Sequence, residues 1–309
     1  TFLNKGTHYW DVNCTDVHAN VGSDINSALR IHYPPVASFV KSTENGSGDE
    51  WEYGKAVISD SLGNIYVAGN LNGYTESDVN FGGNFTISDR GSGSNDFFVV
   101  KYDSNGVTQW VKSPENDSGV GSDEPSDLAL DSSNNIYVVG RTSSEILDFG
   151  NGVIINRDNY MNFFVVKYDS SGVAQWAKSS ENGSGTGNDY GESISIDSLG
   201  NIYVAGTTTS SLDFGNSVTL SNNGSSEFFV VKYDSSGVAQ WAKSLENTSG
   251  NSGEQSQSVS TDSLGNVYVS GNTWSTILDF GNSVTLSNTD GGDFFVVKYD
   301  SSGVAQWAK

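Results

Sequence analysis

A repeat of 65 to 66 residues restricts the fold of this chain more than any other sequence feature. The segment FFVVKYDSSGVAQWAKS spans residues 163–179, returns at residues 228–244 and again from residue 294, and a close variant begins at Phe97. Its tryptophans lie 66, 65 and 66 residues apart, at Trp110, Trp176, Trp241 and Trp307. Self-similarity at a fixed period is the signature of like structural units that bury their apolar faces against their neighbours.

A second segment recurs with the same period and completes the unit. It reads DSLGNIYVAG at residues 60–69 and 197–206, DSSNNIYVVG from residue 131 and DSLGNVYVSG from residue 262. Both segments are rich in β-branched and aromatic residues and are bounded by Asp-Ser turns, which is typical of strands. In DSSG the Asp caps the turn and the Gly supplies a positive φ. Each unit is therefore predicted to form two hairpins, or four antiparallel strands.

The first strand of each unit is distinctive because one set of its side chains is small. In the third unit we expect strands at residues 193–197, 201–206, 227–234 and 238–243. The small side chains are those of Ala56, Ala129, Ser193, Ser195, Ser258 and Ser260. Small residues suit an innermost strand near a crowded axis, which favours an all-β β-propeller over a flat sandwich. We predict complete blades over residues 56–111, 127–177, 192–242 and 257–308.

The repeat register extends toward the N-terminus. Residues 28–42, ALRIHYPPVASFVKS, align without a gap with VVKYDSSGVAQWAKS, and Phe39 takes the place of the recurring Trp. We therefore expect residues 25–42 to form a degenerate hairpin, part of a further blade within a propeller domain of residues 25–309. Three sources could supply the missing hairpin: residues 1–24 folding back, further sequence after Lys309, or strands donated by a neighbouring subunit. We favour a neighbouring subunit or a longer chain over the fold-back, and we expect residues 1–24 to be an element of assembly that makes contacts outside its own ring.

At this point the sequence resembles a known family. GNIYVAG, a connection that contains DFG, and DFFVVKYDSSGVAQWAK are similar to the bacterial β-propeller repeat family known as SBBP. The closing strand departs from the family, which often ends it in an aromatic followed by Gly-Gly, whereas this chain has QWAKSxENxSG. The resemblance implies a secreted or cell-surface propeller. It implies no catalytic activity, because the family has no common one.

The charge balance excludes some partners. With 37 acidic and 15 basic residues the formal net charge is −22, which argues against nucleic acid and anionic membranes as partners. No apolar run of about 18 residues is present, so we expect no insertion into a membrane.

The connections between strands are unequal in length and separate two faces. Two turns per unit are minimal, whereas the other connections run to roughly fifteen to twenty residues, well above the usual hairpin loop. Because binding residues concentrate on loops that a rigid scaffold holds, this long-loop face is the candidate for function.

Acidic residues on the long-loop face are weak candidates for a Ca²⁺ site, since Ca²⁺ takes oxygen ligands. None has the regular Asp-x-Asp-x-Asp-Gly spacing, and a solvated acidic rim is the favoured alternative. The candidates are Asp49, Glu50, Asp123, Glu124, Asp189 and Glu192. We expect no other cofactor and no catalytic residues.

Potential glycosylation sites recur on the same face. An Asn-x-Ser/Thr sequon occupies a fixed place in four units, at Asn45, Asn116, Asn182 and Asn247. Two further candidate sites are Asn84 and Asn223, and a seventh sequon lies at Asn13.

Three other repeated features have structural interpretations. We expect the strand lysines, such as Lys167, to extend along neighbouring strands toward a carboxylate or carbonyl. We expect the recurring Trp to pack between blades. The Asp-Phe-Gly string of residues 148–150 and its copies is shared with protein kinases, but the other kinase motifs are missing, so we expect a turn whose Phe packs against the blade.

These patterns favour a non-enzymatic scaffold or adhesion protein of the cell surface or the extracellular space, such as a filament or surface-layer subunit, which associates with itself or with other surface proteins. The alternative is a glycan-binding propeller that uses the long-loop face. An enzyme is disfavoured because no general acid and base can be paired in the sequence.

Overall fold

The computed structural model describes residues 51–72, 76–90, 95–114, 121–156, 161–180, 187–222, 225–248, 253–288 and 292–309. The chain divides into two units, Thr1–Ser38 and Phe39–Lys309, and every described residue belongs to the second. The predicted N-terminal segment 1–24 and the hairpin 25–42 lie outside the described residues. So do several site candidates, namely Asn45, Asp49, Glu50, Asn116, Asn182 and Asn223.

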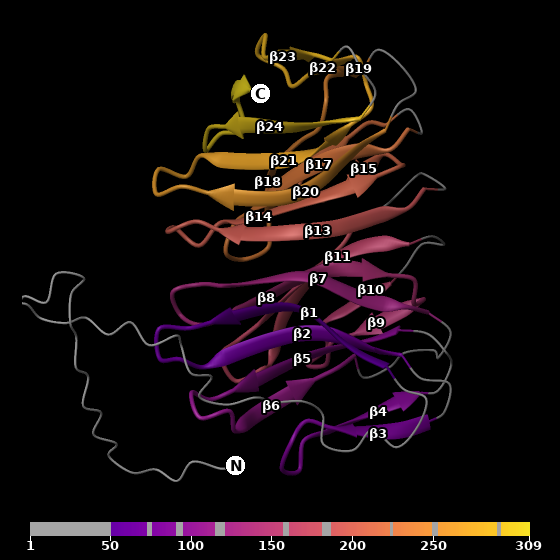
Figure 1. The fold of residues 1–309 in the computed structure, drawn as a ribbon, viewed down its shortest axis with the longest axis vertical. Helices are drawn as coiled ribbons and strands as arrows, with labels where there is room; N and C mark the ends of the chain where they lie inside the picture. The colour runs from indigo at the N-terminus through magenta and orange to yellow at the C-terminus, as the bar shows by residue number, and fades with distance from the viewer. Residues whose placement is uncertain are drawn as a thin grey trace, which may run out of the picture. The chain divides into compact units, whose positions relative to one another are not determined.

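Four antiparallel four-stranded sheets, here called blades 1 to 4, make up the described unit, and the strands of each follow chain order from edge to edge (Figure 1). Blade 1 contains β1 (Trp51–Ser59), β2 (Ile65–Asn72), β5 (Asn95–Tyr102) and β6 (Thr108–Lys112). Blade 2 contains β7 (Asp123–Leu130), β8 (Ile136–Thr142), β11 (Asn162–Tyr168) and β12 (Ala174–Lys178). Blade 3 contains β13 (Asp189–Ile196), β14 (Ile202–Thr208), β17 (Glu227–Tyr233) and β18 (Ala239–Lys243). Blade 4 contains β20 (Glu254–Thr261), β21 (Val267–Thr273), β24 (Asp293–Tyr299) and β25 (Ala305–Ala308).

This arrangement confirms the predicted all-β fold of repeated propeller blades. None of the described segments forms a helix of the length and apolarity that crossing a membrane requires.

The connection between the second and third strand of each blade contains a short hairpin of its own. The four hairpins are β3 (Glu76–Asn80) with β4 (Thr86–Arg90), β9 (Ile146–Asp148) with β10 (Ile154–Asn156), β15 (Leu212–Asp213) with β16 (Thr219–Leu220), and β22 (Ile277–Asp279) with β23 (Thr285–Ser287). In blade 4, β19 (Asn247–Thr248) also pairs with β22.

The Asp-Phe-Gly strings form the turns of three of these hairpins. The amide of Phe149 donates to the carbonyl of Val153, and Asp148 accepts a hydrogen bond from the amide of Gly150. The Phe149 ring is buried and lies 5.7 Å from the ring of Phe164 in the same blade. Phe214 and Phe280 repeat this packing, which confirms the predicted turn.

The tight turns are built by one aspartate each. In blade 3, Asp197 Oδ1 accepts from the amides of Leu199 and Asn201, and Oδ2 accepts from the side chains of Asn201 and Tyr203. Burial opposes ionisation of this carboxyl, but the hydrogen bonds outweigh it and lower the pKa of Asp197. The same contacts recur at Asp60, Asp131 and Asp262.

Aromatic side chains fill the junction between consecutive blades. We call the face that meets the following blade the downstream face and the opposite one the upstream face. Phe163 on the downstream face of blade 2 lies 5.8 Å from Phe214 and 5.3 Å from Phe229, which both belong to blade 3. Phe97 and Phe228 make the corresponding contacts in the other two junctions. The apolar core of the described residues thus has one cluster per junction, and a fourth cluster, which includes Leu71, Phe81 and Phe98, lies within blade 1 and its β3–β4 hairpin.

A polar contact secures each of these junctions. The Nζ of Lys232 lies 5.4 Å from the centre of the Tyr203 ring and donates to the carbonyl of Ser301 in the next blade. Trp241 Nε1 donates to the same carbonyl. Lys101 and Lys167 make the corresponding bonds to Ser170 and Ser235. The predicted roles of these lysines and tryptophans are therefore confirmed.

The first strands of the blades contact one another, as expected for innermost strands. Ser193 Oγ of blade 3 donates to Asp127 of blade 2 and accepts from the amide of Val259 of blade 4. Short side chains at these positions allow the strands to approach closely.

The first strands also begin earlier than the sequence predicted, which corrects the blade boundaries. They start at residues 51, 123, 189 and 254 instead of 56, 127, 192 and 257. The additional residues are mostly polar or Gly and Pro, a composition that predicts loops. A β-bulge, for example between Gly191 and Ser193, carries the strand past them, and their buried carboxylates bond to hydroxyls of the neighbouring strand.

Candidate functional site

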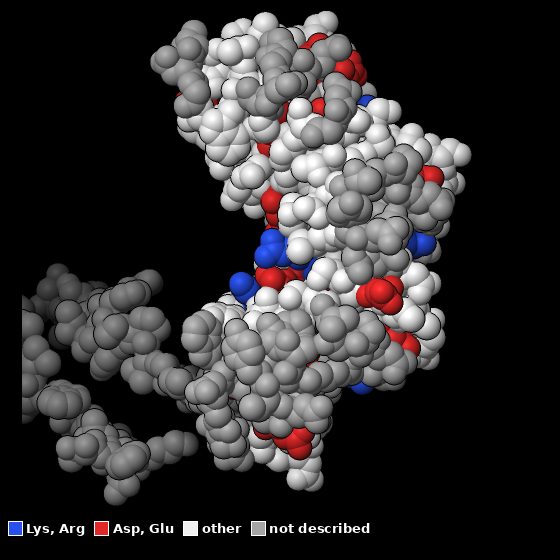
Figure 2. All heavy atoms as spheres, turned by 90° about the vertical axis from the view of Figure 1, so that its right-hand side faces the viewer, with Lys and Arg blue, Asp and Glu red and all other residues white. Residues whose placement is uncertain are grey.

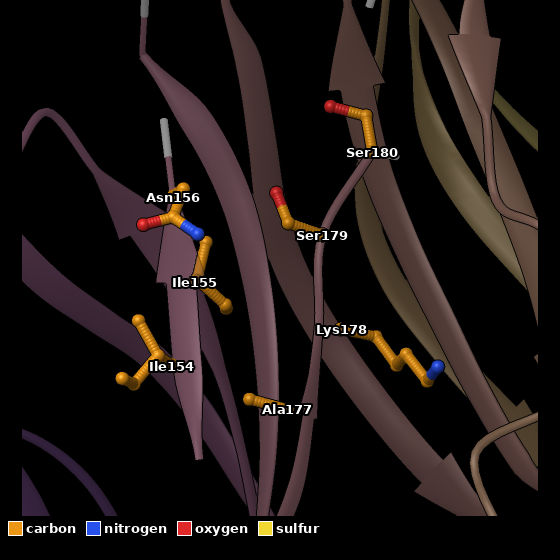
Figure 3. Close-up of a pocket in the computed structure, with 7 residues that line it drawn as sticks. All are labelled: Ile154, Ile155, Asn156, Ala177, Lys178, Ser179 and Ser180. Atoms are coloured by element: carbon orange, nitrogen blue, oxygen red, sulfur yellow. The ribbon is translucent and has the colours of Figure 1, made fainter. Parts of the chain in front are cut away.

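Among the described residues, two hollows with polar linings in blades 2 to 4 are considered as candidate sites. The first, of about 400 Å³, lies beside β10 and the end of β12, and is lined by residues 154–156 and 177–180 (Figure 3). Lys178 extends away from β10 in this view, and Ser179 donates to the carbonyl of Phe163. Ser244 of blade 3 makes the same bond to Phe228. Because the same hydrogen bond recurs in blade 3, Ser179 serves the repeat and does not distinguish this hollow as a binding site.

The second hollow interrupts the repeat and is the better candidate for a binding site. It is a groove of about 290 Å³ on the first strands of blades 2 to 4. Figure 2 looks onto the face that carries the long connections. Acidic and basic side chains lie next to each other there, in the concave part of the left edge. The groove is lined by Ser126, Arg141, Tyr190, Gly191, Glu192 and Gln255.

Arg141 provides the positive charge of the groove. Its Nη2 donates to Glu124 Oε2 at 2.7 Å, and its guanidinium lies 5.4 Å from the centre of the Tyr190 ring. The other Glu124 oxygen accepts from Asn95 of blade 1. Arg141 is 38% exposed at its side chain, so part of the guanidinium faces the groove while Glu124 and Tyr190 hold its plane. An oriented guanidinium can form paired hydrogen bonds with an oxygen-rich ligand.

Glu192 provides a half-buried acid at the groove wall. Thr207 Oγ1 donates to its Oε1 at 3.0 Å and Ser256 Oγ donates to its Oε2. Burial raises the pKa of Glu192, although hydrogen bonds from Ser256 and Thr207 and the charge of Arg141 oppose the shift. Both carboxylate oxygens of Glu192 therefore accept hydrogen bonds from neighbouring strands. This makes Glu192 better suited to holding the groove wall in place than to transferring a proton.

The strand register shows how the groove departs from the repeat. Arg141 pairs with Glu124, and the corresponding pairs in the other blades are Asn70 with Tyr53, Thr207 with Tyr190 and Asn272 with Gln255. Only blade 2 carries a cation at this position, and it stands opposite a carboxylate. The groove is therefore a single site composed of three blades, not one site per blade.

Sequence reasoning singled out Glu124 and Glu192 as weak calcium candidates but did not group them with Arg141, Tyr190 and Gln255. The available signal was a cation at a position where the other units carry Asn or Thr. The structure brings these five residues together because the bulged first strands of adjacent blades lie next to one another.

The remaining calcium candidates of the described ranges lie inside the blades. Asp123 is buried and accepts from Thr142 and Ser144, and Asp189 accepts from Thr208 and Ser210. Within the described ranges, no three His, Cys, Asp or Glu side chains come together in a group that would hold a metal ion.

Two sequons fall within the described residues. Asn84 is exposed in the turn between β3 and β4, and Asn247 lies in β19.

Comparison with known proteins agrees with this architecture. The family model SBBP, a beta-propeller repeat, matches residues 119–153, 183–213 and 240–279. The matches contain the first two strands of blades 2, 3 and 4. The chain is also similar to an uncharacterized WD repeat-containing protein of Acanthamoeba polyphaga mimivirus, with 26% identity over 309 aligned residues. This similarity covers 82% of the chain and 22% of the viral protein, so the chain spans about a fifth of that relative.

Proposed function

We propose that this chain, three stretches of which match the SBBP beta-propeller repeat model, is a non-enzymatic scaffold or adhesion protein. We place it outside the cell or at the cell surface, as a filament or surface-layer subunit. The observation that carries the proposal is the repetition of one set of contacts at three blade junctions. These repeated residues serve the stability of the stack.

The hydrogen bonds and the ion pair of the two groove carboxylates support a binding role over a catalytic one. Glu124 is paired with Arg141, and Glu192 accepts bonds from two hydroxyls, so both carboxylates have protein partners. A general acid or base needs access to the proton that it transfers.

Localisation gives the direct test of the scaffold proposal. Antibodies against residues 51–309 should label intact cells of the source organism, with a cytoplasmic protein of the same cells as the negative control. Labelling that appears only after the cells are permeabilised would contradict the proposed location. The non-enzymatic role would be contradicted if the protein turned over a substrate and Glu192→Gln abolished that activity.

A second candidate function, binding of glycans, is favoured by the groove itself. A partly exposed guanidinium, the Tyr190 ring and the Gln255 amide offer a sugar both a stacking surface and hydrogen bonds. Tyr190→Ala should weaken retention of the protein on a glycan array by about tenfold or more, as loss of a buried aromatic contact does. Tyr53→Ala is the matched control, because Tyr53 has the same register position in blade 1 and lies outside the groove. Equal binding by both variants would exclude the groove as the glycan site.

A further inference from the structure

The groove on the first strands of blades 2 to 4 contains several hydrogen-bond donors that the described part of the protein does not use. A guanidinium has five N–H donors, and Arg141 uses one of them, on Glu124. Its other four N–H groups have no partner among the described residues. The side chains of Ser126, Tyr190 and Gln255 also line the groove, and they make no hydrogen bond to the described residues either. All three blades of the groove therefore offer donors to a ligand.

The acidic oxygens of the groove, in contrast, already accept hydrogen bonds from the protein. Glu124 accepts from Arg141 on one oxygen and from Asn95 on the other. Glu192 accepts from hydroxyls of two neighbouring strands, again one on each oxygen. The balance of the groove therefore favours a ligand that accepts hydrogen bonds over one that donates them.

The charges around the groove leave room for an anion. Arg141 balances Glu124, and Lys55 adds a second cation on the neighbouring first strand. Lys55 is exposed and has the bulge position in blade 1 that Ser126 has in blade 2, and the two strands contact each other. The net charge of −22 is spread over the whole chain, and at physiological ionic strength exposed charges farther away than about 8 Å are largely screened. Contacts within the groove therefore decide which ligand binds.

The held guanidinium selects the kind of acceptor. Glu124 contacts only Nη2 of Arg141, and the Tyr190 ring centre lies 5.4 Å from the guanidinium carbon. A carboxylate matches two parallel N–H groups of a guanidinium, and such charge-assisted bonds are about twice as strong as neutral ones. The groove volume of about 290 Å³ is at the lower end of the range for small-molecule sites. It therefore suits a small group such as one sugar residue.

We infer that the groove binds sugars that carry a carboxylate, such as a uronic acid residue, in preference to neutral sugars. The carboxylate accepts hydrogen bonds from Arg141, the sugar ring packs beside Tyr190, and the Gln255 amide and the Ser126 hydroxyl donate to sugar oxygens. The inference rests on the proposed glycan-binding function. It adds a ligand class to that function and makes Arg141 the residue that determines specificity.

Matched pairs of sugars test this inference on the full chain. A glycan array carries each acidic sugar beside its methyl ester, which differs only in the masked carboxylate. The wild-type protein should be retained about tenfold or more strongly on a free acid than on its ester, as expected for hydrogen bonds to a charged group. Arg141→Gln should abolish this preference. Arg141→Lys should lose most of it, because an ammonium keeps the charge but lacks the planar pair of donors.

Lys178→Gln is the matched control, because it removes one cation from the same blade outside the groove and should leave the preference unchanged. Circular dichroism establishes that each variant retains its fold. Equal retention on acids and esters would overturn the inference and leave the glycan-binding function in place, whereas retention on no sugar would overturn both. The inference would also be overturned by a preference that persists in Arg141→Gln or disappears in Lys178→Gln.

Discussion

The packing of Trp176 on Gly237 allows a sharp test of how the blades are joined. A Cβ added to Gly237 would lie 2.9 Å from Trp176 Cδ2 and 3.1 Å from Cε2, and the residue has a φ of +79°. A left-handed conformation costs an alanine about 1–2 kcal/mol, and overpacking at a rigid contact costs about 1–3 kcal/mol more. Gly237→Ala should therefore lower the free energy of unfolding by about 2–5 kcal/mol.

Gly200→Ala separates the two contributions. Gly200 has the same φ of +79°, but its added Cβ would meet only Ser235 Cβ at 3.8 Å. This control should lose only the conformational cost of about 1–2 kcal/mol. The difference between the two variants then measures the contact with the indole.

Guanidinium denaturation followed by tryptophan fluorescence and by circular dichroism gives both free energies. A double-mutant cycle completes the assay, because in a Trp176→Ala background Gly237→Ala should cost no more than Gly200→Ala does. The reasoning is refuted if the two glycine variants are equally stable in the wild-type background, or if their difference survives removal of the indole.

Three further predictions concern single residues. Trp110→Ala should destabilise the chain by about 3–5 kcal/mol, as expected for a buried indole. Trp307→Ala should destabilise it by clearly less, because Trp307 is 40% exposed. Equal losses of stability in denaturant melts would contradict the assigned junctions. Glu254 is fully buried, and burial, with a contribution from the charge of Glu227, raises its pKa. A raised pKa in the folded state means that stability is fully present below the ordinary value of about 4.3 and is lost as the pH rises through the folded-state pKa. Glu254→Gln should remove this loss and be more stable than the wild type at pH 7 but not at pH 4; a variant less stable at both values would show that the carboxylate is needed as such. Asn84 is exposed in a hairpin turn, so intact mass before and after enzymatic removal of N-glycans from the natural protein should reveal a glycan that Asn84→Gln lacks, and an unchanged mass would exclude modification at this sequon.

Local chemistry explains why much of the fold is readable from the sequence. Strands such as residues 202–208 combine β-branched and aromatic residues with turns that one Asp and one Gly determine, and these interactions span at most six residues. The fixed period then gives the number of blades. The lysine and tryptophan contacts followed from the same repetition, because an identical residue in every unit must serve an interaction that every unit makes.

Tertiary structure decided the features that depend on residues far apart in the chain. Asp123 looked like part of a polar loop, but it is a strand residue because Thr142 and Ser144, about twenty positions later, satisfy its buried carboxylate. The groove is a property of three blades at once, since Arg141, Tyr190 and Gln255 become neighbours only when the first strands stack. Sequence alone determined the unit and its turns because short-range hydrogen bonds and side-chain preferences fix them. The stacking of units determined which polar residues are buried, which remain exposed and which meet in one site.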